Sequence, residues 1–139
     1  SDLSRAAETA DHVAQAAGVP FVLRDARLRE RSFGRLEGTT LAERIGRWGP
    51  DWQKQNHGVE SDRELFGRAE AFLAELARRG EGRFVVVTHG GWIREVFRRF
   101  FPELAGVHPG NTAVSLIRHE EGAWRCLFAH DVSHLPTDA

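Results

Sequence analysis

Apolar residues recur at spacings of three and four along four stretches of the chain, which is the pattern of an amphipathic helix. Glycine closes the two longest stretches, and glycine readily adopts the left-handed conformation found at helix ends. The stretch after Ser61 also opens with the Ser-x-x-Glu spacing of a capping box. The predicted helices are Leu3–Ala17, Thr40–Trp48, the segment from Ser61 to Gly80, and the segment from Trp92 to Pro102.

Short apolar runs between these stretches predict strands. Val19–Leu23 is β-branched and aromatic, and Phe84–Val87 is a continuous apolar run that suits a central strand buried on both faces. Ala113–Ile117 and Trp124–Phe128 are joined through Glu120–Gly122 and predict a hairpin. This order of elements predicts a layered α/β fold, and a chain of 139 residues corresponds to one domain over residues 1–139.

The composition argues against several classes of protein. The chain carries 19 basic and 20 acidic residues, so its net charge of -1 gives no bulk electrostatic attraction to nucleic acid. No apolar run approaches the roughly 18 residues that span a bilayer, so we expect no membrane partner. Cys126 is the single cysteine and cannot form an internal disulfide, which favours a cytoplasmic location. Every basic residue except Lys54 is arginine, whose planar fork of donors suits an anion site.

His89 is the first candidate for chemistry, because it follows the predicted Phe84–Val87 strand at the edge where open α/β sheets place ligands. Gly90 and Gly91 let the backbone approach a ligand closely, and the helix that follows presents free N–H groups to an anion. The alternative is that the glycines only make the turn while His89 satisfies a buried carbonyl. From these residues alone the two interpretations carry equal weight.

Glu30 is the second candidate, since it lies between two arginines in a loop without helical or strand periodicity. A loop carboxylate can act as a general acid, although a solvated charge cluster explains the same residues more simply. Arg5 is, without further context, an ordinary helix arginine. Glu60 precedes the helix that starts at Ser61, where we expect it to interact with the helix dipole rather than with a site.

Other arrangements do not support a site. The spacing of His119, His130, Asp131 and His134 matches no metal-binding motif, so we expect solvent-exposed histidines and no metal. No serine lies in a G-x-S-x-G elbow. Lys54 lacks the preceding glycines of a phosphate-binding loop.

Taken together and in order, five segments resemble the histidine phosphatase superfamily, in its phosphoglycerate mutase-like branch. Ser1–Ala10 resembles the S-x-L-x-R-A-x-x-T helix of that family, and Leu28–Gly38 resembles its L-x-E-x-x-F-G-x-x-E-G loop. Gly58–Ser61 is similar to G-x-E-S, and Val85–Gly91 to the strand and turn of the second histidine. Gly110–Val114 also fits the pattern. Each motif alone is weak, but the ordered set is specific.

The resemblance implies a three-layer αβα sandwich with a mostly parallel mixed sheet, and a phosphomonoester hydrolase that acts through a phosphohistidine. Arg5, His89 and Gly90 would bind the phosphoryl group, and Glu30 would protonate the leaving oxygen. Glu30 and His89 would be the catalytic residues. The substrate would be phosphate or a small phosphorylated metabolite, and the scheme requires no metal or other cofactor. The roles of Arg35, Trp48 and Trp52, like that of Trp92, stay open between a pocket lining and a core.

One departure from the family pattern is large. The nucleophile of the family lies in an Arg-His-Gly motif on the first strand, and no such triplet occurs in these 139 residues. The nearest pair, Arg118-His119, is followed by Glu120. We therefore expect a chain that lacks the first central strand, is close to inactive alone, and can self-associate through an uncovered sheet edge. The alternative is a non-catalytic module that binds a phosphate ligand or a protein.

Two further details favour a phosphatase. The interval between the Glu30 loop and Gly58–Ser61 is short, whereas mutases of the family resemble one another in a longer basic insertion at this point. His89 is followed by glycine rather than aspartate, so the acid-phosphatase branch is a poorer match.

Overall fold

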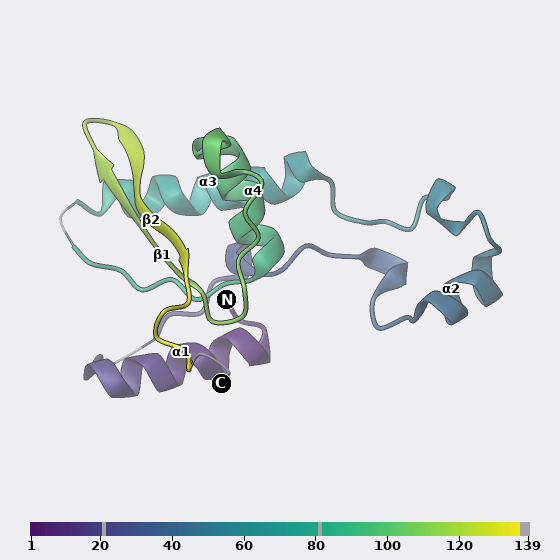
Figure 1. Ribbon diagram of the computed structural model, residues 1–139, viewed down its shortest axis with the longest axis horizontal. Helices are drawn as coiled ribbons and strands as arrows, with labels where there is room; N and C mark the ends of the chain where they lie inside the picture. Colours follow the sequence, from purple (N-terminus) through teal and green to yellow (C-terminus); the bar gives the residue numbers. More distant parts are fainter. Residues whose placement is uncertain (21, 81, 137–139) are drawn as a thin grey trace.

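The computed structural model describes residues 1–20, 22–80 and 82–136. Its α-helices are α1 (Ser4–Ala17), α2 (Leu41–Trp48), α3 (Asp62–Arg78) and α4 (Gly90–Phe100), and its strands are β1 (Val114–Glu120) and β2 (Ala123–Asp131) (Figure 1). Short 3-10 helices are η1 (Ala26–Leu28), η2 (Gly34–Leu36), η3 (Trp52–Lys54) and η4 (Pro102–Leu104). None of the helices described is long and apolar enough to cross a membrane.

The ends of the helices follow from local side-chain chemistry. Ser61 and Glu64 form the predicted capping box at the start of α3, each side chain satisfying a backbone N–H of the other residue. Thr40 and Glu43 do the same for α2. Helix α1 ends at Gly18, whose φ of 66° is the left-handed conformation expected there. The four predicted helices are therefore confirmed, within a few residues at each end.

The predicted hairpin is also confirmed. Strands β1 and β2 pair antiparallel, with His119 opposite Trp124 and Glu120 opposite Ala123. The two turn residues Glu121 and Gly122 have φ values of 51° and 79°, which is the geometry of the tight turns that match strand twist. This pair of strands is the sheet formed by the described residues.

The other two predicted strands are wrong for the described residues. Val85 is 74% exposed and Phe84 is 47% exposed, and the segment 84–87 pairs with no other described segment. Leu23 is 64% exposed and is likewise unpaired, while Phe21 lies outside the described residues. Apolar composition can favour an extended chain, but a strand also needs a neighbour whose N–H and C=O groups complete the ladder.

The core lies where α3, α4 and the hairpin meet, and η1 closes one side of it. Leu65 and Val96 are almost completely buried at its centre. The buried cluster consists of Leu28, Leu65, Ala69, Phe72, Leu73, Trp92, Val96, Phe97 and Phe101. Ile117 and Trp124 of the hairpin pack against this cluster. Helix α4 contributes Trp92, Val96 and Phe97 to this cluster, which fixes the position of its first turn.

The segment between η2 and α3 extends away from the core and carries α2 (Figure 1). The imidazole of His57 contacts the ring of Trp48, with 4.7 Å between centroids, and the guanidinium of Arg44 lies 5.1 Å from the ring centroid of Trp52. The segment closes at its base, where Arg35 N–H donates to His57 O at 2.9 Å. Trp48 and Trp52 therefore pack locally, whereas Trp92 belongs to the core.

We expect Leu65→Ala to lower the free energy of unfolding by about 2–5 kcal/mol, because it opens a cavity among fully packed side chains. Leu41→Ala is the control, since Leu41 is 60% exposed whereas Leu65 is 0% exposed. Urea denaturation followed by circular dichroism measures both. Equal midpoints for the two variants would contradict this placement of the core.

Candidate functional site

The first turn of α4 receives its cap from a distant carboxylate. His89 occupies the position before the helix, and its side chain makes no capping hydrogen bond. Instead, Gly91 N–H donates to Oε2 of Glu30 at 3.1 Å, across 61 residues of sequence. Oε1 of Glu30 accepts from Arg31 N–H at 2.8 Å. The carboxylate therefore lies at the positive end of the helix dipole, where a negative charge is stabilised.

Gly91 is required by this contact, because a Cβ atom built there would overlap with Oε1 of Glu30. Gly90 has no such restriction, since a Cβ atom at that residue meets nothing within 4 Å. Gly90 is also exposed, and its N–H has no acceptor among the residues that the structure describes. The two glycines thus differ, because Gly91 leaves room for the Glu30 carboxylate whereas Gly90 presents its N–H to solvent.

His89 is buried beside this turn, with 7% of its surface exposed. Its Nε2 lies 3.0 Å from Oγ of Ser1. Burial lowers the pKa of His89 below its ordinary value, and the positive charge of Arg5 lowers it further, while the negative charge of Glu30 raises it. His89 is therefore neutral at pH 7, and one ring nitrogen is left to accept or donate.

Arg5 projects from the first turn of α1 and is exposed to solvent. Ala6, the next residue, is buried and anchors that turn. The charge of Arg5 lowers the pKa of His89 and that of Glu30 raises it, so both charges lie within electrostatic range of the His89 imidazole.

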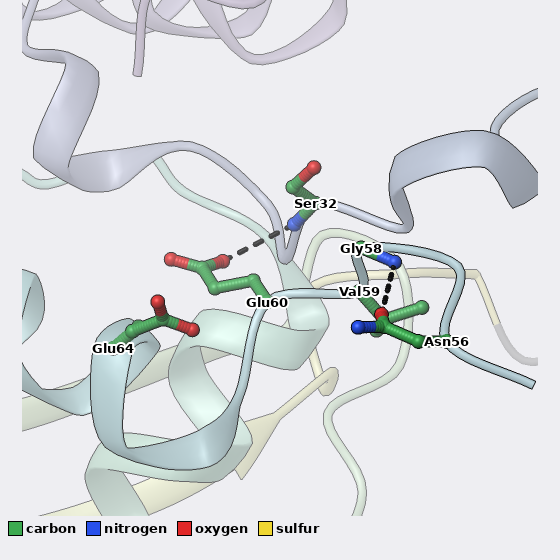
Figure 2. A pocket seen from close by; sticks show the side chains of 6 residues that line it. All are labelled: Ser32, Asn56, Gly58, Val59, Glu60 and Glu64. Atoms are coloured by element: carbon green, nitrogen blue, oxygen red, sulfur yellow. Dashed lines mark hydrogen bonds between the residues drawn. The ribbon is translucent and has the colours of Figure 1, made fainter.

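The role predicted for Glu60 is wrong. Its carboxylate does not lie free before α3 but accepts two hydrogen bonds from Arg68, at 2.7 and 2.9 Å. Oε2 of Glu60 also accepts from Ser32 N–H at 3.1 Å (Figure 2). Arg68 holds the pKa of Glu60 below its usual range. Because Ser32 follows Glu30 by two residues, this ion pair supports the loop of the candidate acid.

Sequence reasoning missed Arg68, although a signal was present. Arg68 lies on α3 three residues after the buried Leu65 and four residues before the buried Phe72, so it belongs to the buried face of the helix. An arginine within an apolar stripe is unusual unless it is paired. That position distinguishes it from the exposed arginines of the same helix.

An open pocket of about 490 Å³ adjoins the loop of Glu30. Its lining is mainly polar, and Asn56 there accepts a hydrogen bond from Gly58 N–H at 2.9 Å (Figure 2). The lining residues are Ser32, Asn56, Gly58, Val59, Glu60 and Glu64. None of the predicted site residues lines it. The described residues contain no group of three or more His, Cys, Asp or Glu side chains arranged to hold a metal ion.

The family model of the histidine phosphatase superfamily (branch 1) matches residues 1–132. The chain therefore belongs to the histidine phosphatase superfamily, as its motifs predicted. The solved structure of a phosphoglycerate mutase from Bacillus anthracis str. Sterne has a TM-score of 0.77 with this chain at 22% identity, covering 96% of this chain and 71% of that one. This similarity confirms the α/β, phosphoglycerate mutase-like fold class.

Two curated relatives come from Arabidopsis thaliana. Phosphoglycerate mutase-like protein 4 is 36% identical over 148 aligned positions, and metal-independent phosphoserine phosphatase is 30% identical over 146. Each alignment covers 97% of this chain. The chain spans 64% and 61%, respectively, of the lengths of these relatives. Both phosphatase-named and mutase-named proteins are thus among its relatives.

We expect Gly91→Ala to displace the Glu30 carboxylate without unfolding the chain, because the overlapping atom is the end of a flexible side chain. Gly90→Ala is the matched control, with open space for its Cβ. The readout is the backbone amide resonance of Arg31, which donates to Glu30. It should move in Gly91→Ala and stay in place in Gly90→Ala. An unmoved resonance in both variants would contradict the contact.

Proposed function

We propose that this chain carries the phosphate-binding residues and the general acid of a phosphomonoester hydrolase that acts through a phosphohistidine. The observation that carries the proposal is the Glu30 carboxylate, held by Gly91 N–H on the first turn of α4, the helix that begins directly after His89. Arg5, His89 and Gly90 N–H bind the phosphoryl oxygens, where their charge and hydrogen bonds offset the negative charge of the transferring group. Glu30 and His89 are the catalytic residues that the chain supplies.

The reaction has two steps. A nucleophilic histidine forms a bond to phosphorus while the bond from phosphorus to the ester oxygen breaks, and protonated Glu30 gives its proton to the leaving oxygen. Water then attacks the phosphohistidine, and the Glu30 carboxylate accepts a proton from that water. The nitrogen–phosphorus bond breaks and inorganic phosphate leaves. The same carboxyl group serves as acid and then as base, and the scheme uses no metal or cofactor.

The substrate class is a small phosphorylated metabolite of the cytoplasm. The relative named as a metal-independent phosphoserine phosphatase supports hydrolysis, and the one named as mutase-like leaves transfer as a related chemistry. The short interval between the Glu30 loop and Gly58 favours hydrolysis, since the mutases that the motifs resemble have a longer basic insertion at this point. Water rather than a second substrate is therefore the acceptor.

The nucleophile must come from outside these 139 residues, because they contain no Arg-His-Gly triplet. Loss of one member of a concerted catalytic set lowers the rate by about a millionfold. These residues alone are therefore near-inactive. The same observation favours a second candidate function, a non-catalytic module that binds a phosphate ligand or a protein.

Inorganic phosphate should bind to the chain at low salt, and Arg5→Ala and His89→Ala should each weaken binding about 10-fold to 150-fold. These factors correspond to about 1.5–3 kcal/mol for a hydrogen bond to a charged group. Arg47→Ala is the control, since Arg47 is an exposed arginine on α2. Isothermal titration calorimetry with phosphate and with vanadate measures all three. Unchanged affinity in both site variants would end the proposal.

An extended chain with an Arg-His-Gly strand placed before Ser1 should hydrolyse phenyl phosphate and form a phosphohistidine, whereas the 139 residues alone should not. In the extended chain, Glu30→Gln should lower kcat for phenyl phosphate about 10²–10⁴-fold, the usual contribution of a general acid. The loss should be smaller for 2,4-dinitrophenyl phosphate, whose leaving group needs no proton. An extended chain that binds phosphate but forms no phosphohistidine would support the binding module instead.

A further inference from the structure

The turn that carries Glu30 is held by its backbone carbonyls. Four consecutive carbonyls, from Arg27 to Glu30, all accept hydrogen bonds from side chains of α3, of α4 or of Thr88. The pairs are Arg27 O with Trp92 Nε1 at 2.9 Å and Arg68 Nη1 at 2.7 Å, Leu28 O with Thr88 Oγ1 at 2.8 Å, Arg29 O with Arg68 Nη1 at 2.6 Å, and Glu30 O with Arg68 Nη2 at 3.1 Å. Arg68 therefore supplies three of these bonds.

Arg68 uses all five of its N–H donors at this place. Three go to the carbonyls of the turn, and the other two, from Nε and Nη2, go to the carboxylate of Glu60 at 2.7 and 2.9 Å. Both side chains are largely buried, with 19% of Arg68 and 15% of Glu60 exposed. A planar guanidinium reaches five acceptors at once, which the single nitrogen of a lysine does not.

Glu60 extends the same support to the other side of Glu30. Glu60 N–H donates to Ser32 O at 2.8 Å, and Ser32 N–H donates to Oε2 of Glu60 at 3.1 Å (Figure 2). The guanidinium of Arg31 donates to Glu60 O at 3.1 Å. The backbone before and after Glu30 is thus tied to one buried ion pair, and Glu30 lies between the two attachments.

We infer that Arg68 is a positioning residue, which fixes the backbone of Glu30 so that its carboxylate lies on Gly91 N–H beside His89. The inference rests on the proposed function, in which that carboxylate is the general acid. Arg68 itself touches no reacting atom. It acts only through the turn, and so its removal changes where the carboxylate lies.

The imidazole of His89 reports the position of the Glu30 carboxylate. The charged groups that act on the pKa of His89 are Arg5, Glu30, the amino group of Ser1 and Arg68. Glu30 alone among them raises this pKa, while the three positive charges lower it. A carboxylate that leaves its fixed position becomes screened by solvent, and the pKa of His89 then falls further. Arg68→Lys keeps the positive charge, so its effect on His89 comes through geometry.

The experiment is an NMR titration of the anion-free chain that follows the His89 ring and the Gly91 amide. In Arg68→Lys the His89 titration should move to lower pH and the Gly91 amide resonance should shift. Glu30→Gln should move the His89 titration in the same direction, and the double variant should match Glu30→Gln alone. Arg63→Lys, the same change on the same helix at an exposed arginine, should match the wild type.

Two results would overturn the inference. One is a folded Arg68→Lys with both signals unchanged, and the other is a double variant in which the two shifts add in full. If Arg68→Lys does not fold, Glu60→Gln takes its place, because Glu60 does not act directly on His89. The two signals should then move in the same directions, and unmoved signals would reject the inference. Phosphate binding by the wild type, measured separately, tests the proposed function itself.

Discussion

The contact between the Glu30 carboxylate and Gly91 N–H is the constraint on which the rest of the site depends. It joins a loop that has no regular structure to the first turn of a buried helix, and it places a negative charge where the helix dipole favours one. Helix α4 is itself fixed by the core, since Trp92 and Val96 are both buried. The Glu30 side chain is therefore connected to the helix by one hydrogen bond, from Gly91 N–H, and its backbone is held separately by the hydrogen bonds of the turn.

The backbone of Glu30 is supported by a buried ion pair, Arg68 with Glu60. Removing a charged guanidinium and a carboxylate from water is costly, and a buried ion pair is tolerated only when the remaining donors and acceptors are also satisfied. Arg68 and Glu60 meet this condition, because every donor of Arg68 is used. A pair of this kind adds little net stability compared with apolar side chains, but it fixes one arrangement of the surrounding backbone. For the role proposed for Glu30, a fixed position of its backbone matters more than a gain in the free energy of unfolding.

The sequence predicted the features of the fold that depend on local interactions. The helices follow from apolar spacing and capping boxes, and the hairpin follows from a two-residue turn with a glycine. The strand expected at Phe84–Val87 was not found, because a strand depends on a partner that its own residues do not encode.

At the candidate site, too, local sequence features were predictable and tertiary contacts were not. His89 and Gly90 were singled out by a glycine turn before a helix, and Glu30 by its place between two arginines in a loop. Arg5 entered through the resemblance of its helix to the family. Arg68 was missed, and its partner Glu60 was misinterpreted, because they lie eight residues apart and meet only when the loop before α3 folds back on the helix. Sequence spacing identifies the groups that can react, whereas the groups that hold them depend on tertiary contacts.

A crystal structure of the chain with vanadate bound tests the proposed site most directly. We expect a single vanadate within hydrogen-bond distance of the Arg5 guanidinium, the His89 imidazole and Gly90 N–H, with the Glu30 carboxyl group on the side where a leaving oxygen would lie. A vanadate bound elsewhere, with Arg5 and His89 directed into separate regions, would contradict the proposed site.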